Sequence, residues 1–483
     1  MEKPVRVRIA PSPTGPLHIG TARTALFNYL FAKKFGGHFI LRIEDTDLER
    51  SDKKYEKDIF DGLAWLGIDA DESPEKGGKY GPYRQSERIG TYKKYLGKLL
   101  ADGAAFYCLH SEQELSAEKE TLMAEKKPLA HWCEFRDVPL ADAETKLGQS
   151  HVIRFKTPHN QKIVFKDIIR GELSFDSELI GDFSIAKDID VPLYNFAVVI
   201  DDAEMKISHV IRGEEHISNT PKQLLLMVAL GFEKPGYAHL PLILGTDRSK
   251  LSKRRGATSV IDYKNEGYLP EALFNFMALL GWNPGDEREI LSKEELKNEF
   301  SLEKIQKSGA IFDITKLDWM NGEYIRKKST EDLVALCLPY LEKIIAPELL
   351  HATSYKLQTI IALEQPRLKK LSEIGERVEY FFKQPEYDKE LLRWKKMSDT
   401  DISASLEKSE KIITQFKSTI TKTEIEKEFL KEIGDGDKGI ILWPLRVALT
   451  GKKASPSPFE ILEIMERDVA LERIAIAKKK IVA

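Results

Sequence analysis

The sequence predicts a multidomain chain in which an α/β part is followed by an all-α part. Residues 1 to about 105 alternate strand-like and helix-like segments, which is the βαβ rhythm of a parallel sheet. Short strands and one charged helix occupy residues 106–190, and strand patterns nearly vanish from about residue 262 onward. Because 483 residues exceed a single hydrophobic core, we expect roughly two to four domains.

The α/β part begins with a strand, "VRVRI", in which apolar and basic residues alternate. The helix "TARTALFNYLFAKK" and a second strand, "HFILRIE", follow it. The strand rhythm resumes after residue 190 with "YNFAVVIDDAEMKISHVIRGEEH", and then come a helix, "TPKQLLLMVALGF", and a strand, "HLPLILG". We therefore predict one α/β body made of residues 1–105 and 191–261.

An insertion interrupts this body at residues 106–190. It contains the charged helix "SEQELSAEKETLMAEKK" and the short strands "SHVIRFKT", "KIVFKDII" and "GELSF", which predict an α+β insertion. Later segments such as "LPEALFNFMALLGW", "STEDLVALCLPYLEKII" and "SYKLQTIIALEQPRLKKLSEI" have a helical period. We expect helices throughout residues 262–325 and 326–483, with connectors at "NPGDERE" and "GDGDKG".

Composition limits the possible partners and the compartment. The net charge of −3 argues against duplex DNA, whereas 31% charged residues can still form the local basic face that a structured RNA needs. No apolar run approaches the roughly 18 residues of a membrane-spanning helix. The start, "MEKPVRVRIAPSP", lacks the apolar core of a secretory signal, and three cysteines fit a reducing compartment. These features predict a cytoplasmic protein.

The turn after the first strand, "RIAPSPTGPLHIG", places His18 and Gly20 at the start of a helix. Helix N-termini present free N–H groups and a partial positive charge, so they bind phosphate. Gly20 lacks a Cβ and lets a ring or phosphate approach the backbone, and His18 can donate a hydrogen bond to a phosphate oxygen. By itself the stretch also fits a proline-rich surface turn.

A second motif, "KLSKR", covers Lys250 to Arg254 on a loop that follows the last strand of the α/β body. A mobile loop of this kind can bring Lys253 onto a triphosphate. Alone it is a charge run, which is usually only solvated. Together, a phosphate-binding turn and a lysine loop favour a nucleotide site.

Five long segments in this order extend the pattern: "RIAPSPTGPLHIGTAR", "RIEDTDLERS", "GPYRQSER", "VIRGEEHISNTP" and "KLSKRRGATS". They resemble the bacterial type of glutamyl-tRNA synthetase, a class I aminoacyl-tRNA synthetase family, and "FDITKLDWMNGEYIR" and "PLRVALTG" extend the resemblance over the whole chain. The resemblance implies a Rossmann-type class I catalytic domain, an acceptor-end-binding insertion, a helical stem-contact domain at 262–325 and an anticodon-binding region at 326–483.

The implied reaction joins glutamate to tRNA in two steps, through glutamyl-adenylate, with ATP and Mg²⁺ as co-reactants. Such chemistry needs positioning and charge stabilisation more than a nucleophilic side chain. The resemblance assigns ATP to His18, Gly20, Lys250, Ser252, Lys253 and Arg254, of which His18, Lys250 and Lys253 are catalytic. It assigns glutamate to Arg8, Ala10, Ser12, Glu44, Tyr194 and Arg212.

The chemistry of glutamate agrees with this assignment. Its two carboxylates need two cations, which Arg8 and Arg212 supply, and its ammonium needs an anion, which Glu44 supplies. Val198 stands where some relatives have a polar side chain, so contacts on that wall are less defined, and His216 is assigned only loosely. No magnesium ligand can be named, and Asp45 and Asp47 are expected to brace the site.

Two Cys and two His in the insertion have the composition of a zinc site. Cys108 and His110 form a C-x-H pair, and His131 and Cys133 form an H-x-C pair 20 residues further on. Such a set can bind zinc tetrahedrally, and some relatives carry a structural zinc here. Two unrelated thiols and two surface imidazoles remain the alternative.

The choice of tRNA is predicted to depend on Arg367. Anticodons for glutamate and glutamine differ at the third base, and unpaired anticodon bases can be read on their edges. In discriminating family members, an arginine in a segment resembling "ALEQPRLKKLSE" does this, and Arg367 follows Pro366, which should end a helix. Gln365 departs from the basic residue of some relatives. A solvated helix-end arginine is the alternative.

Several rival functions share part of this pattern. A nucleotidylyltransferase without RNA leaves the helical C-terminal region without a role, and a non-catalytic RNA-binding paralogue should lack His18, Lys253 or Arg8. A truncated enzyme that glutamylates a tRNA base lacks the anticodon region, and a glutaminyl enzyme should end in β-barrels. We therefore expect tRNA(Glu), L-glutamate and ATP as partners, no DNA or membrane, and a monomer. Whether tRNA for glutamine is also charged stays open.

Overall fold

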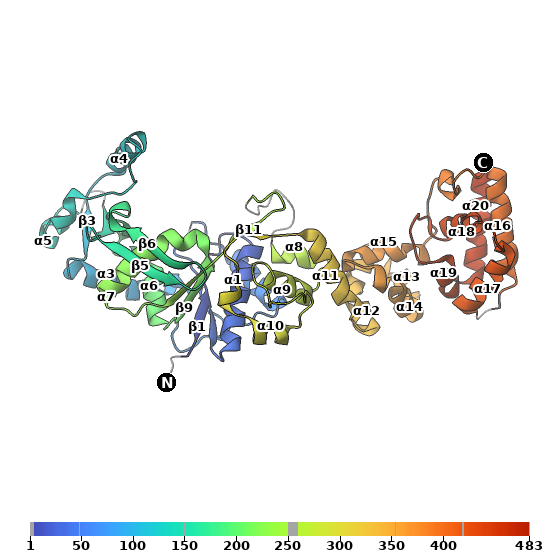
Figure 1. The fold of residues 1–483 in the computed structure, drawn as a ribbon, viewed down its shortest axis with the longest axis horizontal. Coiled ribbons are helices and arrows are strands. Elements are labelled where there is room, and N and C mark those ends of the chain that lie inside the picture. Colours follow the sequence, from blue (N-terminus) through green and yellow to red (C-terminus); the bar gives the residue numbers. More distant parts are fainter. Residues whose placement is uncertain are drawn as a thin grey trace. The chain divides into compact units, whose positions relative to one another are not determined.

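The chain separates into two compact units. We describe a computed structural model that covers residues 4–47, 49–147, 151–249, 259–352, 354–417 and 420–482. One unit holds Met1–Lys264 with Pro270–Leu317, and the other holds Asn265–Leu269 with Asp318–Ala483. Figure 1 draws the strands up to residue 244 in blue to green and the helices of the second unit in yellow, orange and red. The α/β plus all-α prediction is confirmed, and the finer division into four parts stays a prediction.

Two parallel βαβ units build the first unit. β1 (Arg6–Ile9), α1 (Ile19–Lys34) and β2 (His38–Leu41) form one, with Arg8 opposite Ile40. β9 (His209–Gly213), α7 (Thr220–Leu230) and β10 (Gly236–Leu240) form the other. Ser208 N donates to Arg6 O at 2.8 Å, which joins the start of β9 to β1. The carboxyl ends of these strands therefore meet at one edge, where ligands bind in parallel sheets.

The insertion forms an antiparallel sheet in the order β3-β4-β7-β8 and a hairpin. The sheet strands are β3 (Ala105–Cys108), β4 (Val152–Phe155), β7 (Ser184–Asp188) and β8 (Val191–Pro192), and the hairpin strands are β5 (Lys162–Asp167) and β6 (Gly171–Asp176). β5 pairs in parallel with β10 at Tyr237, so the hairpin extends the sheet of the α/β body. The charged helix α4 (Glu112–Ala124) buries none of its residues and begins with a Ser111–Glu114 capping box.

One sequence expectation is wrong. The segment expected to resume the strand rhythm after residue 190 begins with α6 (Tyr194–Glu204), and only then comes β9. The run of Val198, Val199 and Ile200 has the composition of a strand, but all three are buried in the main hydrophobic core. Packing inside the core therefore overrides the weak local preference, and α6 carries Asp201 and Asp202 into the interior.

The remaining elements of the first unit are short. They are α2 (Lys53–Trp65), α3 (Ile89–Ala101), α5 (Leu140–Glu144), β11 (Ile243–Leu244), α9 (Pro270–Ala278), α10 (Lys293–Glu299) and β12 (Ala310–Ile311). Helices α8 (Val260–Asn265) and α11 (Ile314–Arg326) continue into the second unit. β11 and β12 pair in parallel as a separate two-stranded sheet.

The second unit is helical over the residues that the structure describes. Its helices are α12 (Thr330–Leu341), α13 (Pro347–Ala352), α14 (Ser354–Glu364), α15 (Ile374–Val378), α16 (Asp399–Thr414), α17 (Lys422–Ile433), α18 (Gly439–Thr450), α19 (Pro458–Ile464) and α20 (Arg467–Val482). Leu406, Leu445 and Ile474 from α16, α18 and α20 are fully inaccessible in one core. Within the described ranges, no helix is long and apolar enough to cross a membrane.

Candidate active site

A cavity of about 530 Å³ lies at the carboxyl ends of β1 and β9. Its wall is made by the end of β1 and the turn after it, the first residues of α1, the end of β9 and the start of α6. The six residues that the sequence assigns to glutamate all line it: Arg8, Ala10, Ser12, Glu44, Tyr194 and Arg212. Gly20 lines the same cavity. The fold thus gathers residues from five separate segments, and their individual roles stay predictions.

The two arginines of the cavity differ in their partners. Arg8 donates from Nε and Nη2 to the two carboxylate oxygens of Asp202, at 3.0 and 3.1 Å. Arg212 donates from Nη2 to Thr220 Oγ1 at 2.8 Å and from Nε to His239 Nε2 at 3.3 Å. Its Nη1 is buried and has no hydrogen-bond partner among the described residues, and burial lowers the pKa of Arg212. A buried guanidinium without an acid partner is suited to bind a carboxylate.

Glu44 supplies the negative charge of the cavity. Its Oε1 accepts a hydrogen bond from Arg42 Nη2 at 3.0 Å. Burial raises the pKa of Glu44, while the nearby Arg42 and Arg8 oppose that rise. The anion is thus held in the interior by two cations and is able to pair with an ammonium group.

The wall also holds a second acid, Glu215, and neutral polar side chains. Burial raises the pKa of Tyr194, whose hydroxyl lies 3.4 Å from His216 Nδ1. Burial and the charge of Arg212 lower the pKa of His216 to about 4. Val198, where some relatives have a polar side chain, lies in the core and not in the cavity lining.

The turn before α1 has the geometry of a phosphate site. His18 is the N-cap of α1, and its Nδ1 accepts a hydrogen bond from Gly20 N at 3.0 Å. In a neutral ring the proton is then on Nε2, which can donate to a phosphate oxygen. A Cβ on Gly20 would lie 3.3 Å from His18 Nδ1 and would reach no residue beyond His18. The first turn of α1 holds no acidic residue that would repel an anion.

The lysine motif lies outside the described residues, and so do its predicted ATP contacts Lys250, Ser252, Lys253 and Arg254. The described part of the chain resumes at Ser259. Ser259 pairs with His18 as an antiparallel bridge, and Val260 N donates to Leu17 O at 3.0 Å. Ser259 and Val260 are therefore attached to the phosphate turn.

Asp45 and Asp47 are engaged in local hydrogen bonds. Asp45 accepts from the backbone N and the hydroxyl of Ser86 at 2.9 and 2.7 Å. Asp47 accepts from Arg50 Nε at 2.6 Å. Both contacts agree with the bracing role expected from the sequence.

Two residues near the cavity were missed by the sequence analysis. Asp202 binds Arg8, and Arg42 is fully inaccessible between Asp202 and Glu44. Arg42 stands two residues before Glu44 in a strand-like segment, but nothing in that pattern separates a buried arginine from an exposed one. Asp202 is far from both in sequence, so only the fold brings it to them.

The four residues of the candidate zinc site come together in the insertion. Potential ligand atoms of Cys108, His110, His131 and Cys133 all lie within 4.8 Å of one another. Cys108 Sγ is 3.4 Å from His110 Nδ1 and 3.8 Å from His131 Nε2, and Cys133 Sγ is 3.7 Å from His110 Nδ1. Contact with Cys133 and the two imidazoles lowers the pKa of Cys108. The four side chains therefore form one cluster, and zinc binding by it stays a prediction.

Arg367 lies at the end of a helix, as the sequence predicts. α14 ends at Glu364, and a 3-10 turn, Gln365–Arg367, follows it. The Arg367 side chain is 33% exposed, and its Nε is 4.0 Å from Glu364 Oε2. Gln365 Nε2 donates to the backbone oxygens of Ile325 and Lys328 at 3.0 and 2.9 Å. The glutamine, which replaces the basic residue of some relatives, therefore caps the carboxyl end of α11.

Two family models match the chain. The model described as "tRNA synthetases class I (E and Q), catalytic domain" matches residues 4–319, and the model described as "Anticodon binding domain" matches residues 332–478. Fold, cavity and family models together define a class I aminoacyl-tRNA synthetase. A nucleotidylyltransferase without RNA does not account for the anticodon-binding domain.

Full-length relatives narrow the class further. The chain is 46% identical over 487 residues to glutamate–tRNA ligase 1 of Caldicellulosiruptor saccharolyticus, covering 98% of this chain and 99% of that protein. It is 45% identical over 478 residues to the glutamate–tRNA ligase of Carboxydothermus hydrogenoformans, covering 97% and 99%. A crystal structure of the glutamate tRNA ligase from Elizabethkingia meningosepticum in complex with its amino acid has a TM-score of 0.87 at 35% identity, covering 99% of both chains. The chain belongs to the glutamate–tRNA ligase family.

Proposed function

We propose that this chain attaches L-glutamate to tRNA(Glu) in two ATP-dependent steps. The observation that carries the proposal is the buried guanidinium of Arg212, whose Nη1 lacks a partner among the described residues in a cavity that also holds Arg8 and Glu44. The two arginines match the two carboxylates of glutamate, and Glu44 matches its ammonium. The N-terminus of α1 beside the same cavity suits the phosphates of ATP.

In the first step, a carboxylate oxygen of the α-carboxyl group attacks the α-phosphorus of ATP. A new P–O bond forms, the bond between the α-phosphorus and the bridging oxygen breaks, and pyrophosphate leaves with that oxygen. Arg8 and Arg212 hold the substrate carboxylates, and Glu44 pairs with the ammonium. His18 donates from Nε2 to a phosphate oxygen, and Lys253 stabilises the charge on the leaving pyrophosphate. Mg²⁺ supplied with ATP neutralises phosphate charge.

In the second step, the 3′-terminal ribose hydroxyl of tRNA attacks the carbonyl carbon of glutamyl-adenylate. An ester bond forms and AMP leaves with the phosphate oxygen. In this proposal residues 106–190 bind the acceptor end, residues 262–325 contact the stem and residues 326–483 bind the anticodon arm. The α/β body of residues 1–105 and 191–261 performs the chemistry.

Aminoacylation of purified tRNA(Glu) and tRNA(Gln), with pyrophosphate exchange measured with and without tRNA, tests this function. Arg8→Ala and Glu44→Ala should each raise the KM for glutamate and leave the KM for ATP nearly unchanged. Equal effects on both substrates would contradict the assignment, and exchange without glutamate dependence would contradict the function.

We further propose that Cys108, His110, His131 and Cys133 hold a structural zinc ion. Two thiols and two imidazoles match the donor set of a closed tetrahedral site. His131 Nδ1 contacts Glu118 Oε2 at 2.5 Å, so Nε2 is the nitrogen left for a metal, as in carboxylate–histidine–metal arrangements. His110 faces both sulfur atoms with Nδ1.

Metal analysis after purification without chelator should give about one zinc per chain. Cys108→Ser should lose the metal, whereas Cys337→Ser, which changes a buried free thiol outside the cluster, should keep it. A metal-free wild-type protein with full activity would contradict the zinc site.

The tRNA preference, oligomeric state and location belong to the same proposal. Arg367 reads the third anticodon base, the enzyme acts as a monomer, and it works in the cytoplasm, where ATP, glutamate and tRNA are found. Partial exposure of Arg367 supports its role in reading the anticodon, and the three free thiols support the location in the cytoplasm. A dimer mass in solution, measured by light scattering, would contradict the monomeric state.

A further inference from the structure

Two arginines of β1 point to the same face of the strand, because they stand two residues apart. Each forms a bidentate pair of hydrogen bonds with one carboxylate. Arg6 donates from Nη1 and Nη2 to Glu72 at 2.8 and 2.9 Å, and Arg8 donates from Nε and Nη2 to Asp202. Only Arg8 lines the glutamate cavity.

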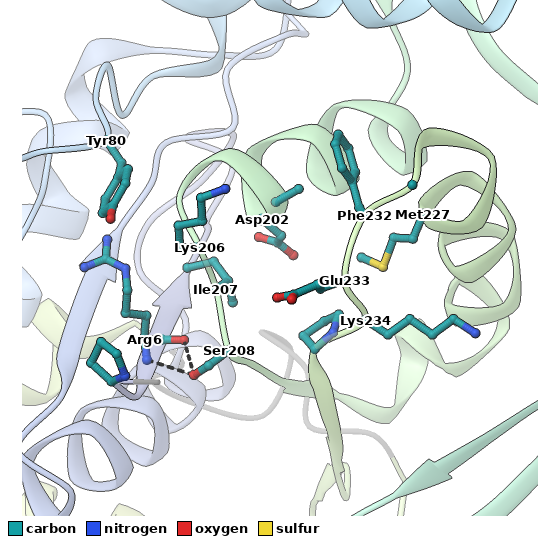
Figure 2. Close-up of a pocket in the computed structure, with 14 residues that line it drawn as sticks. Arg6, Tyr80, Asp202, Lys206, Ile207, Ser208, Met227, Phe232, Glu233 and Lys234 are labelled. Atoms are coloured by element: carbon teal, nitrogen blue, oxygen red, sulfur yellow. Dashed lines mark hydrogen bonds between the residues drawn. The ribbon is translucent and has the colours of Figure 1, made fainter. Parts of the chain in front are cut away.

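Arg6 lines a different cavity, of about 850 Å³, at the amino ends of the parallel strands. Figure 2 shows Arg6 hydrogen-bonded to Ser208 at one side of that cavity and Asp202 at another. Asp202 thus contributes to the lining of this second cavity, while its partner Arg8 contributes to the first. The Arg8–Asp202 pair therefore stands in the wall between the two cavities.

We propose that Asp202 positions Arg8 to receive a carboxylate of glutamate, and that Arg42 joins this pair to Glu44 so that cation and anion of the site are set as one unit. The inference rests on the proposed function, since it concerns the same amino-acid site. It assigns Asp202 and Arg42 as positioning residues that do not touch the substrate.

The bonding of Arg8 supports a positioning role. A guanidinium has two edges that can bind a carboxylate with two parallel N–H bonds. Asp202 occupies the Nε–Nη2 edge, and among the described residues no acceptor bonds to Nη1. The Nη1–Nη2 edge remains for the substrate. Without Asp202, the long side chain would regain rotamer freedom that it must lose again on binding.

Arg42 connects the two halves of the site. Its Nη1 donates to Asp202 Oδ1 at 2.8 Å, and its Nη2 donates to Glu44 Oε1 at 3.0 Å. Its side chain is fully inaccessible to solvent. One buried cation therefore holds both the acid that orients Arg8 and the acid assigned to the ammonium. The distance between the two charges that recognise glutamate is set by this bridge and not by solvent-exposed side chains.

Asp201 offers a matched comparison on the same helix. It is as inaccessible as Asp202, but it binds Arg88 Nε at 2.6 Å, Gln85 Nε2 at 2.8 Å and the Tyr92 hydroxyl at 2.9 Å. None of these three partners lines the glutamate cavity. Asp201 therefore joins α6 to α3 and the turn before it. Its Oδ2 also lies 3.6 Å from Arg42 Nε, an ion pair without a hydrogen bond, whereas Asp202 accepts direct hydrogen bonds from both Arg8 and Arg42.

The test compares Asp202→Asn with Asp201→Asn in glutamate-dependent pyrophosphate exchange, with tRNA present. We expect Asp202→Asn to raise the KM for glutamate by about 10-fold to 10²-fold, since misplacing a binding group by about 1 Å has effects of this size. The KM for ATP should stay within about twofold of the wild-type value, which is a much smaller change than the one expected in the KM for glutamate. Asp201→Asn should lower thermal stability and should raise the KM for glutamate by clearly less than Asp202→Asn does, because Asp201 approaches only Arg42 Nε, at 3.6 Å, and does not bond to Arg8.

Asp202→Glu is the second variant, since it keeps the charge and displaces it by one methylene. It should raise the KM for glutamate by less than Asp202→Asn does, and it tests the proposal even if the asparagine variant fails to fold. A wild-type KM for glutamate in either Asp202 variant would overturn the proposal, as would an equal rise in Asp201→Asn. Failure of the proposed function is distinguishable, because wild type itself would then show no glutamate-dependent exchange.

Discussion

The amino-acid cavity of the first unit and the Arg367 helix end of the second unit both present arginine, in opposite settings. Arg8 and Arg212 are 4% and 5% exposed, and Arg8 is held by a carboxylate at 3.0 Å. Arg367 is 33% exposed, and its Nε lies 4.0 Å from its acid partner, Glu364. A buried charge interacts strongly and must be fixed beforehand, whereas a half-exposed one is screened by water and can adjust. Substitutions in the amino-acid cavity should therefore change activity more than substitutions at the Arg367 helix end.

The largest effect is expected for Arg212→Gln. Removing one partner of a buried charge pair costs about 2–5 kcal/mol, so the KM for glutamate should rise by at least about 30-fold. The KM for ATP should stay close to wild type. Steady-state pyrophosphate exchange at varied glutamate measures this. Arg6→Gln is the control, because Arg6 is equally buried but lines the other cavity, and a similar rise there would show that the effect is not local.

Lys253→Ala is expected to lower the rate of glutamate activation by roughly 10²–10³-fold, the usual cost of losing one group that stabilises developing charge. Folding should change little. Single-turnover measurement of adenylate formation checks the rate, and thermal unfolding checks the fold. A loss of less than about threefold would remove Lys253 from the mechanism and would leave the buried arginines as the dominant charges of the first unit.

Much of the fold followed from periodicity, and the exception is instructive. The βαβ rhythm and the helical second unit are strong, repeated patterns, and a proline ends α14 where expected. The prediction was wrong for α6 because Val198, Val199 and Ile200 are typical of strands. In the structure they lie in a hydrophobic core, where a helix or a strand can be buried equally well. Burial on all sides erases the alternation that distinguishes a half-buried strand from a helix.

The residues of the cavity were assigned through the family resemblance, and the fold explains why they meet. Arg8, Ala10 and Ser12 surround the carboxyl end of β1, and parallel strands bring such ends to one edge. Asp202 and Arg42 were not predictable, since a buried ion-pair network is decided by three-dimensional contacts between segments about 160 residues apart. The sequence pattern around one residue does not indicate which acidic side chain will pair with which basic side chain.

A smaller effect is expected for Arg367→Gln. The preference for tRNA(Glu) over tRNA(Gln) should narrow by about 1–3 kcal/mol, by analogy with other base-edge contacts. Charging of both purified tRNAs by wild type and variant measures this preference. Arg377→Gln is the control, because Arg377 lies 3.7 Å from the same Glu364 carboxylate and has a similar exposure. A wild type that charges both tRNAs equally, or a variant that keeps the full preference, would contradict the assignment.

The smallest and most graded effect is the pH dependence of glutamate binding. Burial raises the pKa of Glu44 above its ordinary 4.5. As the pH falls through that raised value, Glu44 takes up a proton and loses the charge that pairs with the ammonium, so the KM for glutamate should rise toward acid. The rise should begin at a higher pH than the titration of the substrate's own side-chain carboxylate, near 4.3. The pH profile of kcat/KM for glutamate reports this group in the free enzyme.

The comparison with Arg367 gives this last measurement its control. Glu364, beside Arg367, also has a pKa raised by burial, but it lies at the helix end of the second unit and should not affect glutamate binding. Glu44→Gln should flatten the acid limb of the profile at a KM that is already high, since a neutral amide does not titrate. Glu364→Gln should leave that limb unchanged. An acid limb that persists in Glu44→Gln would assign the titration to another group, and the cavity would then lack the anion that the ammonium requires.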